Sequence, residues 1–115
     1  MAKLLNQTQN CELLSDLKVA KTFWSRSKGL LGRKALSKAE GLWIHRCNSI
    51  HTFGMKFAID CIFVDRKLRV KALRENVRPG RLVLPIWGAS SVIETTADQI
   101  ANMRLQIGDQ LYVGD

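Results

Sequence analysis

The sequence predicts a mainly β fold, an antiparallel sandwich or partly closed barrel of about seven short strands with two short helices. Short apolar stretches separated by turn residues recur along the whole chain. Residues 58–64 are apolar at every position but one, as in a strand that is buried on both faces. Long helical stretches do not alternate with these strands, which argues against a doubly wound α/β sheet.

The chain has 115 residues, of which 46% are hydrophobic, and both values are typical of one soluble globular domain. We expect residues 1–16 to form a partly ordered N-terminal extension and residues 17–115 to form a single β domain. The first ten residues offer only Leu4 and Leu5 where a secretory signal needs an apolar run of about 7 to 15 residues. This pattern predicts a cytoplasmic protein.

The first elements expected are a strand, a helix and a second strand. Residues 17–21 alternate apolar and basic side chains and predict an edge strand whose lysines face water. Thr22 can cap a short helix that ends near Gly32. Residues 42–50 then predict a strand. The inward face of the expected helix is Phe23, Trp24, Ser27, Leu30 and Leu31.

The strand at 58–64 is expected to be central and to lead into a hairpin. Alternation places Asp60 on one face with Ala58, Ile62 and Val64, and places Ile59, Cys61 and Phe63 on the other. Residues 65–67 predict a turn, and residues 68–74 alternate apolar with basic as the solvated partner strand. Further strands are expected at 81–84, 90–94 and 110–113, and a capping box at 96–99 predicts the second helix, with Ile100 and Met103 on one side.

The formal net charge is +8 and its distribution is uneven. Residues 1–81 contain 17 of the 18 Lys and Arg residues, whereas residues 82–115 contain one basic residue and four acids. Such asymmetry can attract phosphate-rich partners, or it can simply keep a small domain soluble. No run of Lys or Arg exceeds two residues, which favours the second interpretation.

The cysteines and histidines are the residue types that could act as metal ligands or nucleophiles. Cys11, Cys47 and Cys61 are odd in number and widely spaced, which indicates reduced thiols and no disulfide framework. His45 and His51 do not stand with them in the close pairs typical of a zinc site. We therefore expect no metal and no cofactor.

Asp60 is the most informative polar residue, because a charge in a buried strand needs a partner. Lys56 would lie about 13 Å away along the same strand, too far to pair directly. Arg33, Lys28, His51 or a backbone amide remain as partners. The contact would be either a structural tie between elements or part of a working site.

Polar side chains also gather where the chain turns between two expected strands. His51, Thr52, Met55 and Lys56 surround Gly54, and this mixture beside an apolar floor is typical of a small ligand pocket. We expect the ligand-binding residues to be Lys28, Arg33, His51, Thr52, Met55, Lys56 and Asp60. The alternative is a loop whose polar groups bond one another.

Several segments carry a resemblance to a known family. They are Lys28-Gly29-Leu30-Leu31-Gly32-Arg33, Gly41-Leu42-Trp43-Ile44, the stretches 49–56 and 59–65, and Ser91-Val92-Ile93-Glu94 followed by Ile107-Gly108-Asp109. In order and spacing they resemble the domain of unknown function 192 family over about residues 17–113. The resemblance implies a compact, mainly β domain of prokaryotic origin, with no biochemical role assigned at family level.

Three functions are consistent with the sequence. The first is a ligand-binding or accessory module with a polar pocket near residues 51–60 that takes a small polar or anionic ligand, in a monomer or weak homodimer without membrane contact. The second is a hydrolase-like enzyme in which Asp60 or His51 acts as general acid or base. The third is nucleic-acid binding through the basic face, although the tryptophans are not interleaved with basic residues as a base-stacking platform requires.

Overall fold

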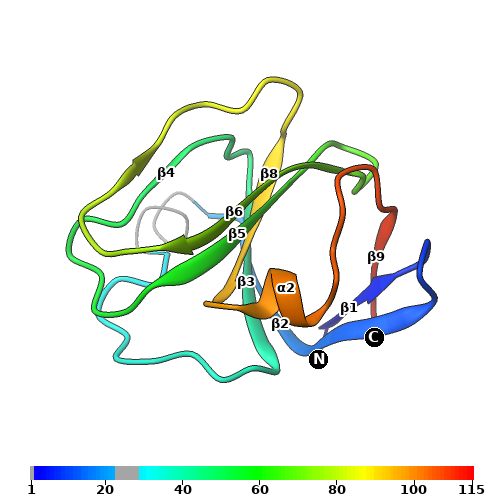
Figure 1. Ribbon diagram of the computed structural model, residues 1–115, viewed down its shortest axis with the longest axis horizontal. Coiled ribbons are helices and arrows are strands. Elements are labelled where there is room, and N and C mark those ends of the chain that lie inside the picture. The colour runs from blue at the N-terminus through cyan, green and yellow to red at the C-terminus, as the bar shows by residue number, and fades with distance from the viewer. Residues whose placement is uncertain (1, 23–28) are drawn as a thin grey trace.

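The structure is a computed structural model that describes residues 2–22 and 29–115, and it is mainly β (Figure 1). Seven strands form one sheet in the order β6-β5-β8-β3-β2-β1-β9, and β4 and β7 form a separate pair. The strands are β1 (Ala2–Asn6), β2 (Cys11–Ala20), β3 (Glu40–His45), β4 (Ile50–His51), β5 (Ile59–Val64), β6 (Val70–Val77), β7 (Leu82–Val83), β8 (Ser91–Thr96) and β9 (Leu111–Gly114). The helix α2 spans Gln99–Asn102.

The large sheet curls into a half-barrel whose two edges approach each other. All neighbouring strands in it are antiparallel except β2 and β3, which are parallel. An isolated bridge joins Arg69 to Gln110, and the Leu111 N–H donates to the Leu68 carbonyl at 2.9 Å. These bonds tie the start of β6 to β9 across the open side, and they confirm the predicted partly closed β architecture.

Strand β5 is buried at every residue, as its apolar composition predicts. It lies between β6 and β8, and its alternate side chains enter two different apolar clusters. The first cluster includes Ile44, Ile50, Cys61, Phe63 and Val92. The second cluster includes Leu4, Leu14, Ile62, Val64, Ile93 and Ile100. The sheet therefore has a core on each face, which also confirms the predicted alternation along β5.

The N-terminal part of the chain differs from the sequence-based expectation. Residues 2–6 and 11–16, expected in an extension, belong to β1 and β2 of the main sheet, and Leu4 and Leu14 are buried in its second cluster. Strand β2, expected at an edge, pairs with β1 on one side and with β3 on the other. Because residues 7–10 make a short turn, the two leucine-bearing segments fold onto each other and supply core that the sequence pattern did not reveal.

Two other local expectations need correction. Strand β3 ends at His45, because Arg46 has a φ of 52° and turns the chain before Ile50. The expected capping box does not form, since Thr96 belongs to β8 and the N-cap of α2 is Asp98, whose side chain makes no capping bond. Helix α2 is the only helix in the described part of the chain. Of the first expected helix, from Thr22 to near Gly32, residues 23–28 lie outside the described residues, and residues 29–32 form turns. No described helix is long and apolar enough to cross a membrane.

Candidate functional site

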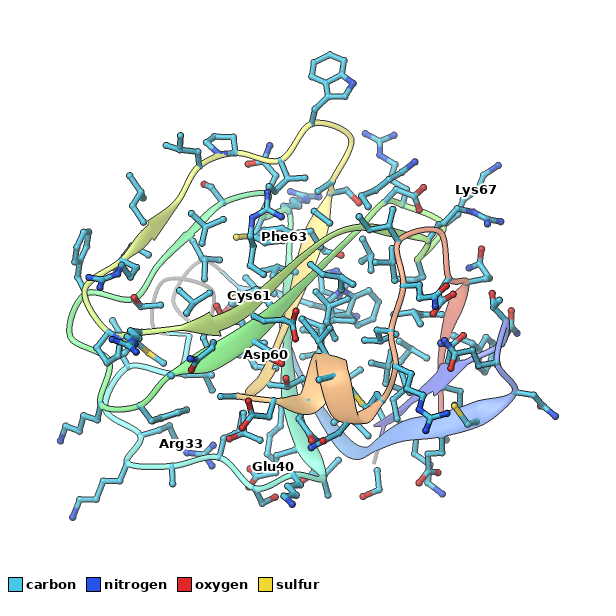
Figure 2. The ribbon with its side chains drawn as sticks, viewed as in Figure 1. Arg33, Glu40, Asp60, Cys61, Phe63 and Lys67 are labelled. Carbon is cyan, nitrogen blue, oxygen red and sulfur yellow. The ribbon has the colours of Figure 1, made fainter. Side chains whose placement is uncertain are left out.

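Asp60, labelled in Figure 2, is fully buried, and its hydrogen-bond partners are backbone amides. Its two carboxylate oxygens accept one bond each, from the Asn76 N–H and from the Ile100 N–H, both at 2.8 Å. The Asn76 N–H is available because β6 carries an extra residue opposite Asp60, where the register with β5 shifts. The Ile100 N–H lies in the first turn of α2, where amides have no partner within the helix. Asp60 therefore joins β5, β6 and α2.

The position of Asp60 separates it from His51. Asp60 has the same parity along β5 as Ile62 and Val64, which enter the second cluster. His51 lines a pocket with Ile44 and Ile50 of the first cluster, on the opposite face of the sheet. Of the alternatives open for Asp60, its contacts are those of a structural tie.

The pocket that His51 lines has a buried acid that the sequence analysis did not single out. This acid is Glu94, and we call the pocket the Glu94 pocket. The volume of the pocket is about 160 Å³. Glu94 comes from β8, in the same parity as Val92 of the first cluster. The described lining residues are Gly29, Leu30, Leu31, Ile44, Cys47, Ser49, Ile50, His51, Met55 and Glu94. The pocket thus joins an apolar floor to a few polar groups.

Glu94 is held in a position that is unfavourable for a charge. Its side chain is buried, with a residue exposure of 5%. Within residues 2–22 and 29–115 no hydrogen bond or ion pair engages its carboxyl, and burial alone raises the pKa of Glu94 to about 7. A buried carboxyl normally has a hydrogen-bond partner. Glu94 lacks one among the described residues, so its carboxyl can still accept or donate a hydrogen bond in the pocket.

The other predicted ligand-binding residues have separate positions. Met55 lines the Glu94 pocket. Thr52 is buried; its hydroxyl donates to the Arg78 carbonyl at 2.6 Å and accepts the Arg81 N–H at 2.8 Å, so that it ties the ends of β4 and β7. Lys56 is exposed on the loop before β5.

The remaining two predicted ligand-binding residues are the cations Lys28 and Arg33. Arg33 pairs with Glu40 at 3.0 Å, and the two labelled side chains lie together in Figure 2. Lys28 lies outside the described residues. Of the seven predicted residues, the Glu94 pocket therefore brings together His51 and Met55.

The cysteines show why a nucleophilic thiol is not favoured at this site. Burial, reinforced by the charges of Glu94 and Asp60, raises the pKa of the Cys61 thiol well above its usual range, so the thiol stays protonated at neutral pH. The Cys47 thiol donates to the Ser49 carbonyl at 2.9 Å. Among the described residues, no group of three His, Cys, Asp or Glu side chains could hold a metal ion.

Glu94 escaped the sequence analysis because its pattern is ambiguous. An acid after Ser-Val-Ile is typical of the exposed end of a strand. Only pairing on both sides, with Leu42 of β3 and Cys61 of β5, buries it. The available signal was parity, since Glu94 shares a face with Val92.

Comparison with known proteins identifies relatives over nearly the whole chain. A model of the DUF192 family, described as Uncharacterized ACR, matches residues 4–113. A UPF0127 protein of Thermococcus sibiricus is 34% identical over 112 residues, which cover 94% of this chain and 72% of the relative. A UPF0127 protein of Pyrococcus horikoshii is 28% identical over 111 residues, covering 94% and 96%. Both relatives are archaeal.

Two solved structures share the fold. A protein of unknown function from Novosphingobium aromaticivorans superposes with a TM-score of 0.83 at 22% identity, covering 96% of this chain and 82% of that one. A Sinorhizobium meliloti protein proposed to be a transcription regulator gives 0.81 at 17% identity, covering 97% and 91%. At these identities the similarity concerns the architecture.

Proposed function

Because this chain belongs to the DUF192 family of uncharacterised proteins, we propose a function from its geometry: it is a binding module that holds a small polar molecule in the Glu94 pocket. The observation that carries the proposal is the buried Glu94 carboxyl, which lines the pocket and has no partner among the described residues. A bound molecule that donates a hydrogen bond would satisfy this carboxyl.

The size and polarity of the pocket define the ligand. About 160 Å³ equals the volume of about five water molecules, so the ligand is a fragment of a few heavy atoms, or the end of a larger molecule. Isoleucine and leucine side chains on the floor favour an apolar body. The acid favours an amine, alcohol or amide over an anion, because two negative charges at this depth repel each other.

Three probes of matched size test this assignment: propylamine, 1-propanol and propionate. Each is titrated into labelled protein at pH 6 and pH 8, and the backbone amide shifts of Ile50, His51 and Met55 are followed by NMR. Because Glu94 ionises around pH 7, propylamine should bind about tenfold more tightly at pH 8 than at pH 6. Affinity for 1-propanol should change little, and propionate should bind most weakly at pH 8.

The Glu94→Gln variant should lose the pH dependence, because glutamine has nearly the same shape but does not ionise. Glu75→Gln is the matched control, since Glu75 is exposed on β6. The proposal fails if none of the three probes shifts the pocket amides, or if Glu94→Gln leaves the order of the probes and their pH dependence unchanged. Tightest binding by propionate would instead support an anionic ligand.

A further inference from the structure

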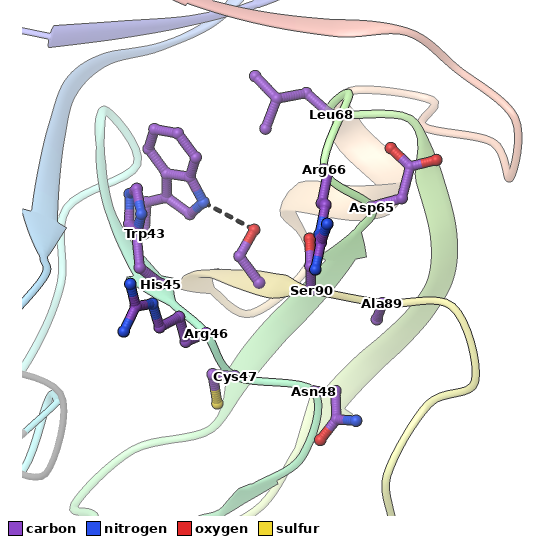
Figure 3. Close-up of a pocket in the computed structure, with 11 residues that line it drawn as sticks. Trp43, His45, Arg46, Cys47, Asn48, Asp65, Arg66, Leu68, Ala89 and Ser90 are labelled. Atoms are coloured by element: carbon purple, nitrogen blue, oxygen red, sulfur yellow. Dashed lines mark hydrogen bonds between the residues drawn. The ribbon is translucent and has the colours of Figure 1, made fainter.

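A second and larger cavity lies at the end of the sheet formed by the C-terminus of β3, the N-terminus of β8 and the turn between β5 and β6 (Figure 3). We call it the Trp43 cavity. Its volume is about 730 Å³, within the range of about 300 to 1,000 Å³ that is usual for small-molecule sites. Among the described lining residues, only Cys47 also lines the Glu94 pocket, so the two sites have different sets of lining residues.

One wall of the Trp43 cavity is aromatic and fixed in place. The Trp43 and His45 rings lie with their centroids 4.1 Å apart at an angle of 41°. The indole Nε1–H of Trp43 donates to Ser91 Oγ at 2.9 Å, the bond drawn as a dashed line in Figure 3. This bond joins neighbouring strands and holds the indole in one orientation. A positioned indole offers a planar ligand a surface on which to stack.

The described charged residues that line the cavity are two arginines and one aspartate. The arginines are Arg46 and Arg66. Within the described ranges, no carboxylate forms an ion pair with Arg66. The lining acid, Asp65, is already engaged, because its carboxylate accepts the N–H groups of Lys67 and Arg69 at 2.9 and 3.0 Å and lies 3.7 Å from Lys71 Nζ.

We propose that the Trp43 cavity binds a planar ring that carries a carboxylate or phosphate, with the ring against Trp43 and the anion at Arg66. A guanidinium presents planar, paired donors that match both kinds of anion. The cavity is large enough for the whole of such a ligand, unlike the Glu94 pocket. This inference does not depend on the function proposed for Glu94.

Two anionic probes distinguish the source of the charge, benzoate for an aryl carboxylate and adenosine 5′-monophosphate for a nucleotide. Adenosine and inorganic phosphate are the controls for ring and charge alone. Binding is followed through the indole N–H signal of Trp43, assigned by its loss in Trp43→Phe. At least one of the two anionic probes should shift this signal. If adenosine 5′-monophosphate binds, adenosine and phosphate should each bind at least about tenfold more weakly than it does.

The turn between β5 and β6 supplies a matched pair of variants. Arg66 and Lys67 are adjacent, exposed and of equal charge, but only Arg66 lines the cavity. Arg66→Ser should weaken binding of the anionic ring about tenfold, and Lys67→Ser should change it less than about twofold. Equal losses in both variants would indicate general attraction by a basic surface and overturn the proposal. It is also overturned if neither benzoate nor adenosine 5′-monophosphate moves the Trp43 signal at millimolar concentration, or if adenosine binds as tightly as its monophosphate.

Discussion

Replacing Glu94 by Gln should make the protein more stable relative to wild type as the pH rises. In the folded chain burial raises the pKa of Glu94 from 4.5 to about 7. Below pH 4.5 the carboxyl is protonated in both the folded and the unfolded chain, so it costs nothing. Between pH 4.5 and 7 the unfolded chain releases the proton while the folded chain retains it, and stability is lost. Above pH 7 the loss is complete.

The difference between the two pKa values of Glu94, 4.5 in the unfolded chain and about 7 in the folded chain, corresponds to about 3 kcal/mol of unfolding free energy. About 2 to 3 kcal/mol of this loss falls between pH 5 and pH 8. Glutamine has no ionisable group, so the variant escapes this loss. The free energy of unfolding of Glu94→Gln minus that of wild type should therefore increase by about 2 to 3 kcal/mol over this interval.

Urea denaturation of both proteins at pH 5, 6, 7 and 8 measures the difference directly. All other titrating groups are common to the two proteins and cancel in the subtraction. Glu75→Gln, at an exposed position, should give a flat difference. If the Glu94→Gln difference also stays within about 0.5 kcal/mol from pH 5 to 8, the carboxyl is not held in an unfavourable site and the reasoning about the pocket is refuted.

Four further outcomes can be measured. Asp60→Asn should lower the free energy of unfolding by about 1 to 3 kcal/mol, because one amide oxygen cannot accept from both the Asn76 and Ile100 N–H groups; unchanged stability in urea would contradict the tie. Thr52→Val should cost about 1 to 3 kcal/mol in the same assay while Thr52→Ser keeps most of the stability, and equal losses would show that the hydroxyl is irrelevant. Gly41→Ala should cost about 1 to 3 kcal/mol, because the added Cβ would lie 2.5 Å from Leu14 Cδ1; a wild-type melting temperature would show that the leucine moves freely. Retention on a phosphate resin should depend only weakly on salt, whereas a steep dependence would favour nucleic-acid binding.

The sequence predicted the centre of the fold better than its margins. Residues 58–64 are apolar in both parities, and only a strand covered on both faces accounts for that pattern, as β5 is. The β5–β6 hairpin follows from the alternation after Asp65. The segment of residues 1–16 has no comparable pattern. Its place in the sheet depends on long-range pairing of β1 with β9, which local sequence does not encode.

The candidate site was predictable only in part for the same reason. A charge in a buried strand correctly marked Asp60 as a residue that needs a partner, but the partners are amides supplied by a bulge and a helix start, which have no sequence signature of their own. His51 and Met55 line the pocket because their turn faces the first cluster. Glu94 lines the same pocket although it lies 39 residues after Met55 in the sequence. The pairing of β8 with β3 and β5 brings it there, and such long-range pairing cannot be read from neighbouring residues.

Because β5 contributes side chains to both apolar clusters, we expect the protein to unfold cooperatively. Cys61 and Phe63 serve one cluster, and Ile62 and Val64 serve the other, so withdrawing this strand exposes both at once. Neither half can melt while the other remains intact, and loss of structure should be cooperative. Amide protons of β5 and β8 should then exchange with solvent only through global opening, at one common rate-limiting free energy.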